Sequence, residues 1–140
     1  MADPVPAASQ VMAVAASALR AQQARMRVIA ENMANADSTS KTPGGDPYRR
    51  QIPVFTPKIQ PGGGPGVAMT AVVSDTTPFG IQYQPGHPSA DAKGYVKTPN
   101  VNALVEALDL KDAQRAYSAN ISVIETARAM DAAAMTLLKQ

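Results

Sequence analysis

Apolar residues repeat at helical spacing in the first part of the chain. One set recurs every seven residues, and a second set follows three residues after each of its members: Met12, Leu19, Met26 and Met33, then Ala15, Gln22, Ile29 and Ala36. This a/d pattern over four heptads is typical of a helix that packs along a narrow seam, with polar Gln22 as its weak point. We therefore predict a helix over residues 7–36, which the turn-forming run at residues 35–40 should end.

The last part of the chain carries a second helical pattern, over residues 101–138. Its apolar and small positions recur at steps close to one helical turn: Leu104, Leu108, Ala113, Tyr117, Ile121, Ile124, Ala127, Met130, Ala134 and Leu138. Asn100 or Asn102 would cap the start of this helix, and Glu106 suits the positive end of the helix dipole. A helix of this length reaches about 55 Å at 1.5 Å per residue, which is long for so small a domain.

Glycine and proline separate the two helical patterns. All nine glycines, and all twelve prolines except Pro4 and Pro6, lie between residues 43 and 99. Both residues destabilise helix interiors, glycine by about 1 and proline by about 3 kcal/mol. The middle of the chain is therefore predicted to be irregular or β structure.

Short alternating patterns within this middle part predict strands. Residues 48–55 and 67–73 are the two clearest candidates, and residues 81–83 are a possible third. Pro53 and Pro57 remove backbone donors from the first candidate, so it should be an edge strand or a short one.

Together these patterns predict a mainly α fold with a small β module. The terminal helices, in residues 1–40 and 100–140, would pack as an antiparallel coiled-coil hairpin, and residues 41–99 would form a β-rich insertion containing proline and glycine. All aromatic residues except Tyr117 lie in that insertion, so we expect it to have a small core of its own. Alanine-rich seams bury little apolar surface, so we favour further packing between neighbouring subunits over an intramolecular hairpin alone.

Charge and composition exclude several classes of function. The net charge is +2 and basic residues are interspersed with acidic ones, so the sequence lacks the clustered basic face of a nucleic-acid binder. The absence of cysteine excludes a disulfide framework and a thiol nucleophile. No apolar stretch approaches the length of a membrane span, so no direct membrane insertion is predicted. Residues 11–21 resemble the apolar part of a signal peptide, but no Lys or Arg precedes them, so no cleaved leader is expected.

Two features of the middle part suggest chemistry without supporting it. The glycine-rich run at residues 62–66 lacks the Lys-Ser or Lys-Thr of a phosphate-binding loop, so we interpret it as a tip between strands. His87, the sole histidine, is near Asp91 in sequence, but a metal site would show more ligands and no nucleophile is recognisable beside it. We predict no enzyme activity, no cofactor and no metal, with a small hydrolase centred on His87 kept as an alternative.

Both ends of the chain resemble the flagellar rod and hook protein family. Residues 16–22 and 25–39 are similar to its N-terminal signature, a helix followed by an Asn-rich turn, which here is Asn-Ala-Asp-Ser-Thr. Residues 100–127 look like its C-terminal helix. In the middle, PYRR at residues 47–50 and PGHPSADAKGYV at residues 85–96 resemble a small proximal-rod subunit of the flagellar basal body. The glycine-rich run is a departure from the family pattern.

This resemblance implies a structural subunit of the rod, the drive shaft of the flagellar basal body, with no chemistry of its own. It implies export by the flagellar type III apparatus without a cleaved signal peptide, followed by assembly in the periplasm. The terminal helices would line an export channel and transmit torque. Partners would be copies of this chain, other rod proteins, and membrane-ring and rod-adaptor components at the base. Another rod subunit of the same family, or a secreted helical effector or adaptor, is the alternative.

The resemblance and the helical patterns together give a set of candidate contact residues. Those expected to pack within and between subunits are Leu19, Met26, Ile29, Met33, Tyr117, Ile121, Ile124 and Leu138. Asn32 and Asn35 are candidates for polar contacts between subunits. Asn32, Asn35 and Asn120 either fix the register of packed helices, as single buried asparagines do in coiled coils, or merely cap or face solvent. Arg49 and Arg50 are expected to make contacts of the middle module.

Overall fold

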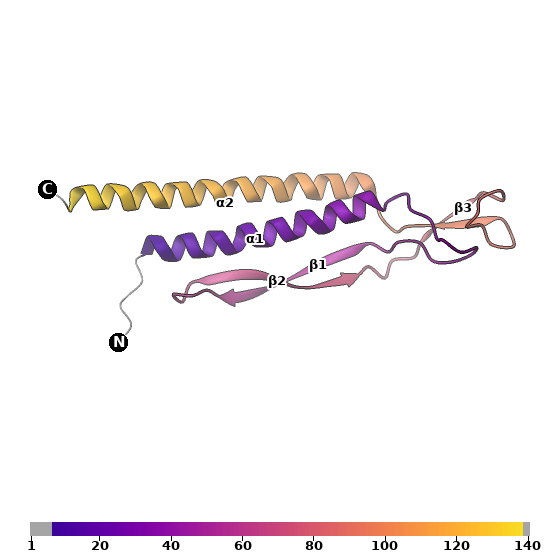
Figure 1. The fold of residues 1–140 in the computed structure, drawn as a ribbon, viewed down its shortest axis with the longest axis horizontal. Helices are drawn as coiled ribbons and strands as arrows, with labels where there is room; N and C mark the ends of the chain where they lie inside the picture. The colour runs from indigo at the N-terminus through magenta and orange to yellow at the C-terminus, as the bar shows by residue number, and fades with distance from the viewer. Residues whose placement is uncertain (1–6, 139–140) are drawn as a thin grey trace. The chain divides into compact units, whose positions relative to one another are not determined.

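The computed structural model describes residues 7–138, which form two long helices and four strands (Figure 1). In chain order the elements are α1 (Ala7–Ala34), β1 (Gln51–Ile59), β2 (Pro65–Ser74), β3 (Gly80–Tyr83), β4 (Tyr95–Thr98) and α2 (Ala103–Leu137). β1 pairs with β2 and β3 with β4, in two separate sheets. The predicted mainly α fold, with a small β module between two terminal helices, is confirmed. Within the described residues, neither helix is both long enough and apolar enough to cross a membrane.

Contacts divide the chain into two compact units, and each of them contains segments of both helices. Unit 1 comprises Met1–Met26, Val54–Ala71 and Asp112–Gln140, and unit 2 comprises Arg27–Pro53 and Val72–Lys111. The predicted boundaries near residues 40 and 99 separate the two helices from the strands between them along the chain. The compact units instead combine helix and strand segments that are far apart in sequence.

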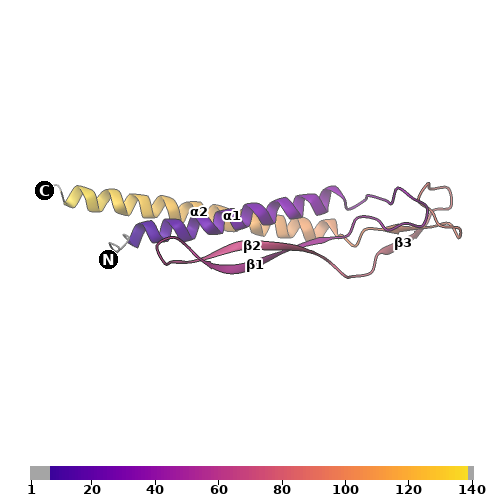
Figure 2. The same ribbon diagram turned by 60° about the horizontal axis from the view of Figure 1, so that its bottom comes forward.

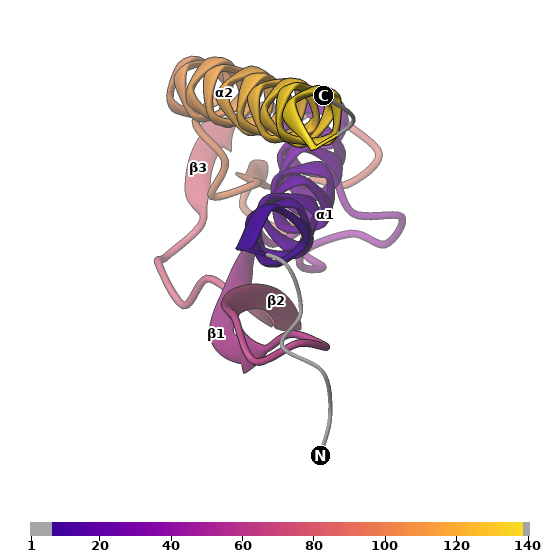
Figure 3. The same ribbon diagram turned by 90° about the vertical axis from the view of Figure 1, so that its left-hand side faces the viewer.

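In unit 1 the two helices run side by side in opposite directions (Figure 3). Near the start of α1, Ala8 lines the same hollow as Met130 of α2. Further along α1, the Gln23 side-chain amide donates to the Tyr117 hydroxyl at 3.3 Å. The most buried residues of these helix segments are small: Ala15, Ser17, Ala21, Ala113 and Ala127. Small side chains each bury little apolar area, so these positions contribute little hydrophobic stabilisation.

The β1–β2 hairpin covers a second face of α1 (Figure 2). The sequence pattern predicted the two strands and their tip, but not this contact with the helix. Ser17 is 2% exposed, and its hydroxyl accepts the Val67 N–H at 3.2 Å and donates to the Val14 carbonyl at 2.7 Å. A Cβ added at Gly66 would lie 2.7 Å from the Ser17 Oγ. The glycine therefore allows β2 to approach the helix closely.

The glycine-rich run forms the tip of the β1–β2 hairpin, as predicted. The Gln60 N–H donates to the Gly64 carbonyl, and the Gly63 N–H donates back to the Gln60 carbonyl, both at 2.9 Å. Gly62 and Gly63 have φ values of 97° and 86°, in the left-handed region that favours glycine. The Gln10 side chain of α1 donates to the Gly62 carbonyl at 3.0 Å, which ties the tip to the helix.

In unit 2, β3 and β4 pair antiparallel. The facing residues are Gly80 with Thr98, Ile81 with Lys97, Gln82 with Val96, and Tyr83 with Tyr95. β4 was not predicted, because four residues are too few to show a period of two beside Gly94 and Pro99. The expected aromatic core of the middle part is wrong: Tyr83 and Tyr95 are 65% and 45% exposed. Their rings meet edge to face with centroids 5.2 Å apart, on the surface of this small sheet.

Candidate functional site

The face of α2 that is least exposed follows alternating steps of four and three residues. Its members are Glu106, Leu110, Ala113, Tyr117, Asn120, Ile124, Ala127 and Asp131. This spacing is that of a heptad seam, as predicted for a coiled-coil hairpin. The seam contains a buried glutamate and a partly buried asparagine, both of which the apolar pattern of the sequence could not include.

The predicted apolar stripe of α2 identified only part of this seam. Ala113, Tyr117, Ile124 and Ala127 belong to it. Other members of the predicted stripe are exposed by 37–83% of their surface: Leu104, Leu108, Ile121, Met130 and Leu138. α2 carries apolar residues on more than one face, so periodicity alone does not show which face the chain itself covers.

The predicted seam of α1 is buried to different degrees. Ile29 is 4% exposed, whereas Leu19, Met26 and Met33 are half-buried. Gln22, the predicted weak point, has a buried side-chain oxygen with no hydrogen-bond partner among residues 7–138. An unpaired buried oxygen costs stability, so the interpretation of Gln22 as an interruption agrees with its environment.

Asn32, in the last turn of α1, is the centre of a buried polar cluster in unit 2. The residue is 1% exposed. Its amide nitrogen donates to the Gln51 carbonyl at 2.9 Å and to a Glu106 carboxylate oxygen at 3.1 Å. Its amide oxygen accepts the Gln51 N–H and the Tyr48 hydroxyl, both at 2.8 Å. All four hydrogen-bonding positions of the side chain are used, so Asn32 joins α1 to both β1 and α2.

A buried ion pair completes this cluster. Glu106, in the first turn of α2, is 1% exposed, and its other carboxylate oxygen accepts the Nε–H of Arg50. This hydrogen bond is the main reason that the pKa of Arg50 is raised. Arg50 also lies 3.4 Å from Asp75 and 3.7 Å from Asp109. Burial, rather than the charges of nearby glutamates, is the main cause of the raised pKa of Tyr48.

Arg49 and Asn100 fasten the segment that follows β2. The Arg49 guanidinium donates to the carbonyls of Asp75 and Thr77 at 2.9 and 3.1 Å, and its Cζ lies 4.1 Å from the centre of the Phe79 ring. The Asn100 amide donates to the same two carbonyls, and its oxygen accepts the Arg50 N–H at 2.8 Å. The two arginines therefore make contacts of the middle part of the chain within unit 2.

The remaining asparagines act locally. Asn35 and Asn120 each donate to the carbonyl four residues earlier in the helix, at 2.8 and 2.9 Å. Asn102 caps α2, with its side-chain oxygen accepting the Leu104 and Val105 N–H groups. Asn32 is the asparagine that bridges the two helices. Of the two predicted capping residues, Asn102 caps α2, and Asn100 instead bonds to the loop after β2.

His87 lies in a tight turn. Its backbone N–H donates to the Gln84 carbonyl at 3.0 Å, and its side-chain Nδ1 accepts the Ser89 backbone N–H at 3.0 Å. Both contacts are within five residues of the chain, as in a rigid turn. Across residues 7–138, the structure groups no three His, Cys, Asp or Glu side chains closely enough to hold a metal ion.

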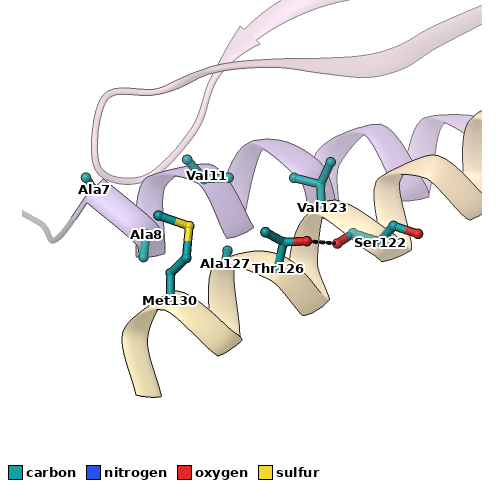
Figure 4. Close-up of a pocket in the computed structure, with 8 residues that line it drawn as sticks. All are labelled: Ala7, Ala8, Val11, Ser122, Val123, Thr126, Ala127 and Met130. Carbon is teal, nitrogen blue, oxygen red and sulfur yellow. Dashed lines mark hydrogen bonds between the residues drawn. The ribbon is translucent and has the colours of Figure 1, made fainter. Parts of the chain in front are cut away.

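An apolar groove lies between α1 and α2 in unit 1 (Figure 4). It measures about 370 Å³ and is lined by Ala7, Ala8, Val11, Ser122, Val123, Thr126, Ala127 and Met130. The Thr126 hydroxyl donates to the Ser122 carbonyl at 2.9 Å, so its polar group is engaged within the helix. The lining contains no charged side chain.

Asp91 in unit 2 is stabilised in its ionised form. The Tyr95 and Lys93 N–H groups donate to one carboxylate oxygen at 3.0 and 2.8 Å, and they lower the pKa of Asp91 below its ordinary value of 3.8. Because the pKa is lower in the folded than in the unfolded chain, the resulting stability is complete above about pH 4. It is lost as the pH falls through the lowered pKa.

We expect Asp91→Asn to reduce the loss of stability in acid. The neutral amide oxygen still accepts both N–H groups, but no carboxylate is left to titrate. Urea unfolding followed by circular dichroism should give a wild-type midpoint that falls below about pH 4, with a smaller fall for the variant. Parallel acid profiles for the two proteins would contradict the role assigned to Asp91.

Comparisons with known proteins extend over both helices. A family model described as "Flagella basal body rod protein" matches residues 12–40, and one described as "Flagellar basal body rod FlgEFG protein C-terminal" matches residues 92–137. The flagellar basal-body rod protein FlgC of Agrobacterium fabrum is 43% identical over 138 residues, which cover 98% of this chain and 97% of the relative. FlgC of Escherichia coli O157:H7 is 43% identical over 89% of the chain and 92% of the relative. FlgC of Bacillus subtilis is 35% identical over 84% and 89%.

Proposed function

Because this chain belongs to the FlgC family of flagellar basal-body rod proteins, and is thus a structural subunit of the rod, we propose that it builds the proximal part of the drive shaft. In this proposal α1 and α2 pack against the helices of neighbouring subunits, line the export channel and transmit torque. The neighbours are copies of this chain and other rod proteins, with membrane-ring and rod-adaptor components at the base.

The observation that supports this proposal best is the apolar surface that α2 leaves uncovered. Its exposed large apolar residues are Leu104, Val105, Leu108, Ile121, Val123, Met130, Met135, Leu137 and Leu138. A helix that is apolar on several faces is normally buried on several faces. One chain covers only the seam of α2, so neighbouring subunits would cover the rest.

The candidate contact residues divide into two groups under this proposal. Ile29, Tyr117 and Ile124 lie at the seam of the subunit itself and set the shape that it presents. Ile121 and Leu138 are 37% and 83% exposed, so they are available to a neighbour. Leu19, Met26, Met33 and Asn35 are partly exposed and would contribute to both kinds of contact.

The route to the rod and the absence of chemistry are further parts of the proposal. Export through the flagellar type III apparatus, without a cleaved signal peptide, would deliver the chain to the periplasm. In this proposal the role requires no cofactor and no catalysis.

Complementation of cells that lack the gene tests this function. Cells without the gene should retain the membrane ring, build no rod and fail to swim, and the wild-type chain should restore both. Ile124→Asp should fail to restore them, because it places a charge at the partly buried seam of α2. Electron microscopy of isolated basal bodies and a swimming assay measure the two outcomes.

Ser118→Asp is the matched control, because it adds the same charge to an exposed position of α2 in the same unit. It should support rods and swimming. Intact rods in the deletion strain would refute the rod function, and normal incorporation of Ile124→Asp would show that the seam does not govern assembly.

A further inference from the structure

Methionine supplies all the sulfur of this chain, because the sequence contains seven methionines and no cysteine. In the described part of the chain, Met130 and Met135 of α2 are 66% and 59% exposed. The other described methionines are only partly exposed: Met12, Met26, Met33 and Met69. A dissolved oxidant must contact the thioether, so it should reach the two α2 residues first.

Met130 differs from Met135 in its surroundings. Its side chain reaches from α2 toward Ala8 of α1 and forms part of the wall of the apolar groove of unit 1, which measures about 370 Å³ (Figure 4). One turn earlier on α2, Ala127 lines the same groove and is 5% exposed. Met130 is therefore open to solvent in the single chain and also belongs to an apolar surface.

The groove offers no side-chain donor to a polar group placed inside it. The Ser122 and Thr126 hydroxyls line it, but they donate to the Ser118 and Ser122 carbonyls of their own helix, at 3.2 and 2.9 Å. The other lining side chains are alanine, valine and methionine, which carry no hydrogen-bond donor. An acceptor added to Met130 would bond to water in the open groove, and to none of these side chains once the groove is covered.

Resting on the proposed function, we propose that Met130 is an oxidation site that controls whether a free subunit enters the rod. The sulfur lone pair attacks one oxygen of a peroxide, the O–O bond breaks, and the thioether becomes a sulfoxide. Sulfur loses two electrons, and hydrogen peroxide gains them and leaves as water. The sulfoxide is uncharged but polar, so covering it in the rod costs the hydration of its oxygen.

This modification is reversible. A methionine sulfoxide reductase removes the oxygen as water, while a dithiol supplies two electrons and becomes a disulfide. The oxidised subunit is therefore held out of the rod and not lost. In an assembled subunit, neighbours that cover the groove would also keep the oxidant from Met130.

Oxidation of the purified full chain by hydrogen peroxide tests the chemistry. Mass spectrometry of peptides after timed exposure gives the oxidation rate at each methionine. In the free chain, Met130 should react several-fold faster than Met26 and Met69, and at a rate similar to that of Met135. In isolated basal bodies, Met130 should react several-fold more slowly than in the free chain. Equal rates at Met130, Met26 and Met69, or an unchanged rate at Met130 in basal bodies, would overturn the proposal.

Substitutions at position 130 test the effect on assembly without adding an oxidant to cells. Met130→Gln places an uncharged amide oxygen in the groove, whereas Met130→Leu keeps the position apolar at similar volume. In cells that lack the gene, Met130→Gln should give several-fold less of the chain in isolated basal bodies than Met130→Leu, and several-fold less swimming. Urea unfolding followed by circular dichroism should give similar midpoints for both variants, because Met130 is mostly exposed in the single chain.

The matched control is the same pair of substitutions at position 135, which lies outside the groove. Met135→Gln and Met135→Leu should differ less than the pair at position 130. Equal differences at the two positions, or a Met130→Gln chain that enters basal bodies as well as Met130→Leu, would show that the groove does not respond to the polarity of this side chain and would sink the proposal. Absence of the wild-type chain from basal bodies would instead refute the proposed function.

Discussion

Asn32→Ala is expected to lower the free energy of unfolding by about 3–5 kcal/mol, a large part of the 5–15 kcal/mol typical of a natural domain. The substitution removes four hydrogen bonds at once from a residue that is 1% exposed. The Gln51 backbone, the Tyr48 hydroxyl and one Glu106 oxygen lose a partner in the interior of unit 2. An unsatisfied buried group costs about 1–3 kcal/mol, and partial entry of water keeps the sum below the total of four such costs.

Asn120→Ala is the matched control for this prediction. Asn120 makes one hydrogen bond, to the Ala116 carbonyl of its own helix, and is only partly buried. Its loss should cost less than about 1 kcal/mol. Urea unfolding of the full chain, followed by circular dichroism at 222 nm, measures both variants. Equal losses for the two asparagines would show that the cluster around Asn32 contributes little.

The sequence predicted the helices and the hairpin because both leave marks in local composition. Segregation of glycine and proline into the middle part set the helix limits to within a few residues of Ala34 and Ala103. The glycine-rich run gave the hairpin tip, since left-handed backbone there favours glycine. β4 could not be recognised from local composition, because it has only four residues and begins 12 residues after the end of its partner β3.

The polar cluster could not be derived from sequence patterns. Asn32, Arg50 and Glu106 are separated by 18 and 56 residues, and each has an ordinary local explanation. Glu106 was expected to serve the helix dipole, and Asn32 to contact another subunit. The fold brings them together in unit 2, where burial leaves each dependent on the others. A pattern that classes asparagine and glutamate as polar places both on the surface.

The sequence also could not show which face of α2 the chain itself covers, because here apolar residues are exposed. Its sequence contains more apolar positions than one chain can cover, so several stripes fit the helical period equally well. Ala113 and Ile124 lie on the face that the chain itself covers, whereas Leu104 and Leu108 are exposed in the single chain. The excess is itself informative, since surface left apolar in one subunit is surface available for assembly.

Arg50→Met is expected to cost about 3 kcal/mol, because it leaves the buried Glu106 carboxylate without its cation. Methionine keeps much of the length and apolar body of arginine, so the loss reports mainly on the charge. Asp75 loses the same neighbour, but its pKa is lowered chiefly by hydrogen bonds from Thr77, and it should be affected less. Arg50→Lys should fall between the wild type and Arg50→Met, since an ammonium supplies charge without the planar fork.

Adding Glu106→Gln to Arg50→Met should recover part of this loss. The glutamine oxygen still accepts from the Asn32 amide, and no uncompensated charge is left in the interior. Chemical unfolding of the wild type, both single variants and the double variant gives the coupling energy between the two positions. A coupling of about 1–2 kcal/mol would show that the ion pair stabilises unit 2 as a pair, whereas additive losses would mean that Arg50 acts through its other contacts. The same four chains, tested by complementation, would separate stability from assembly. If the cluster acts only through folding, swimming should follow the order of the unfolding free energies.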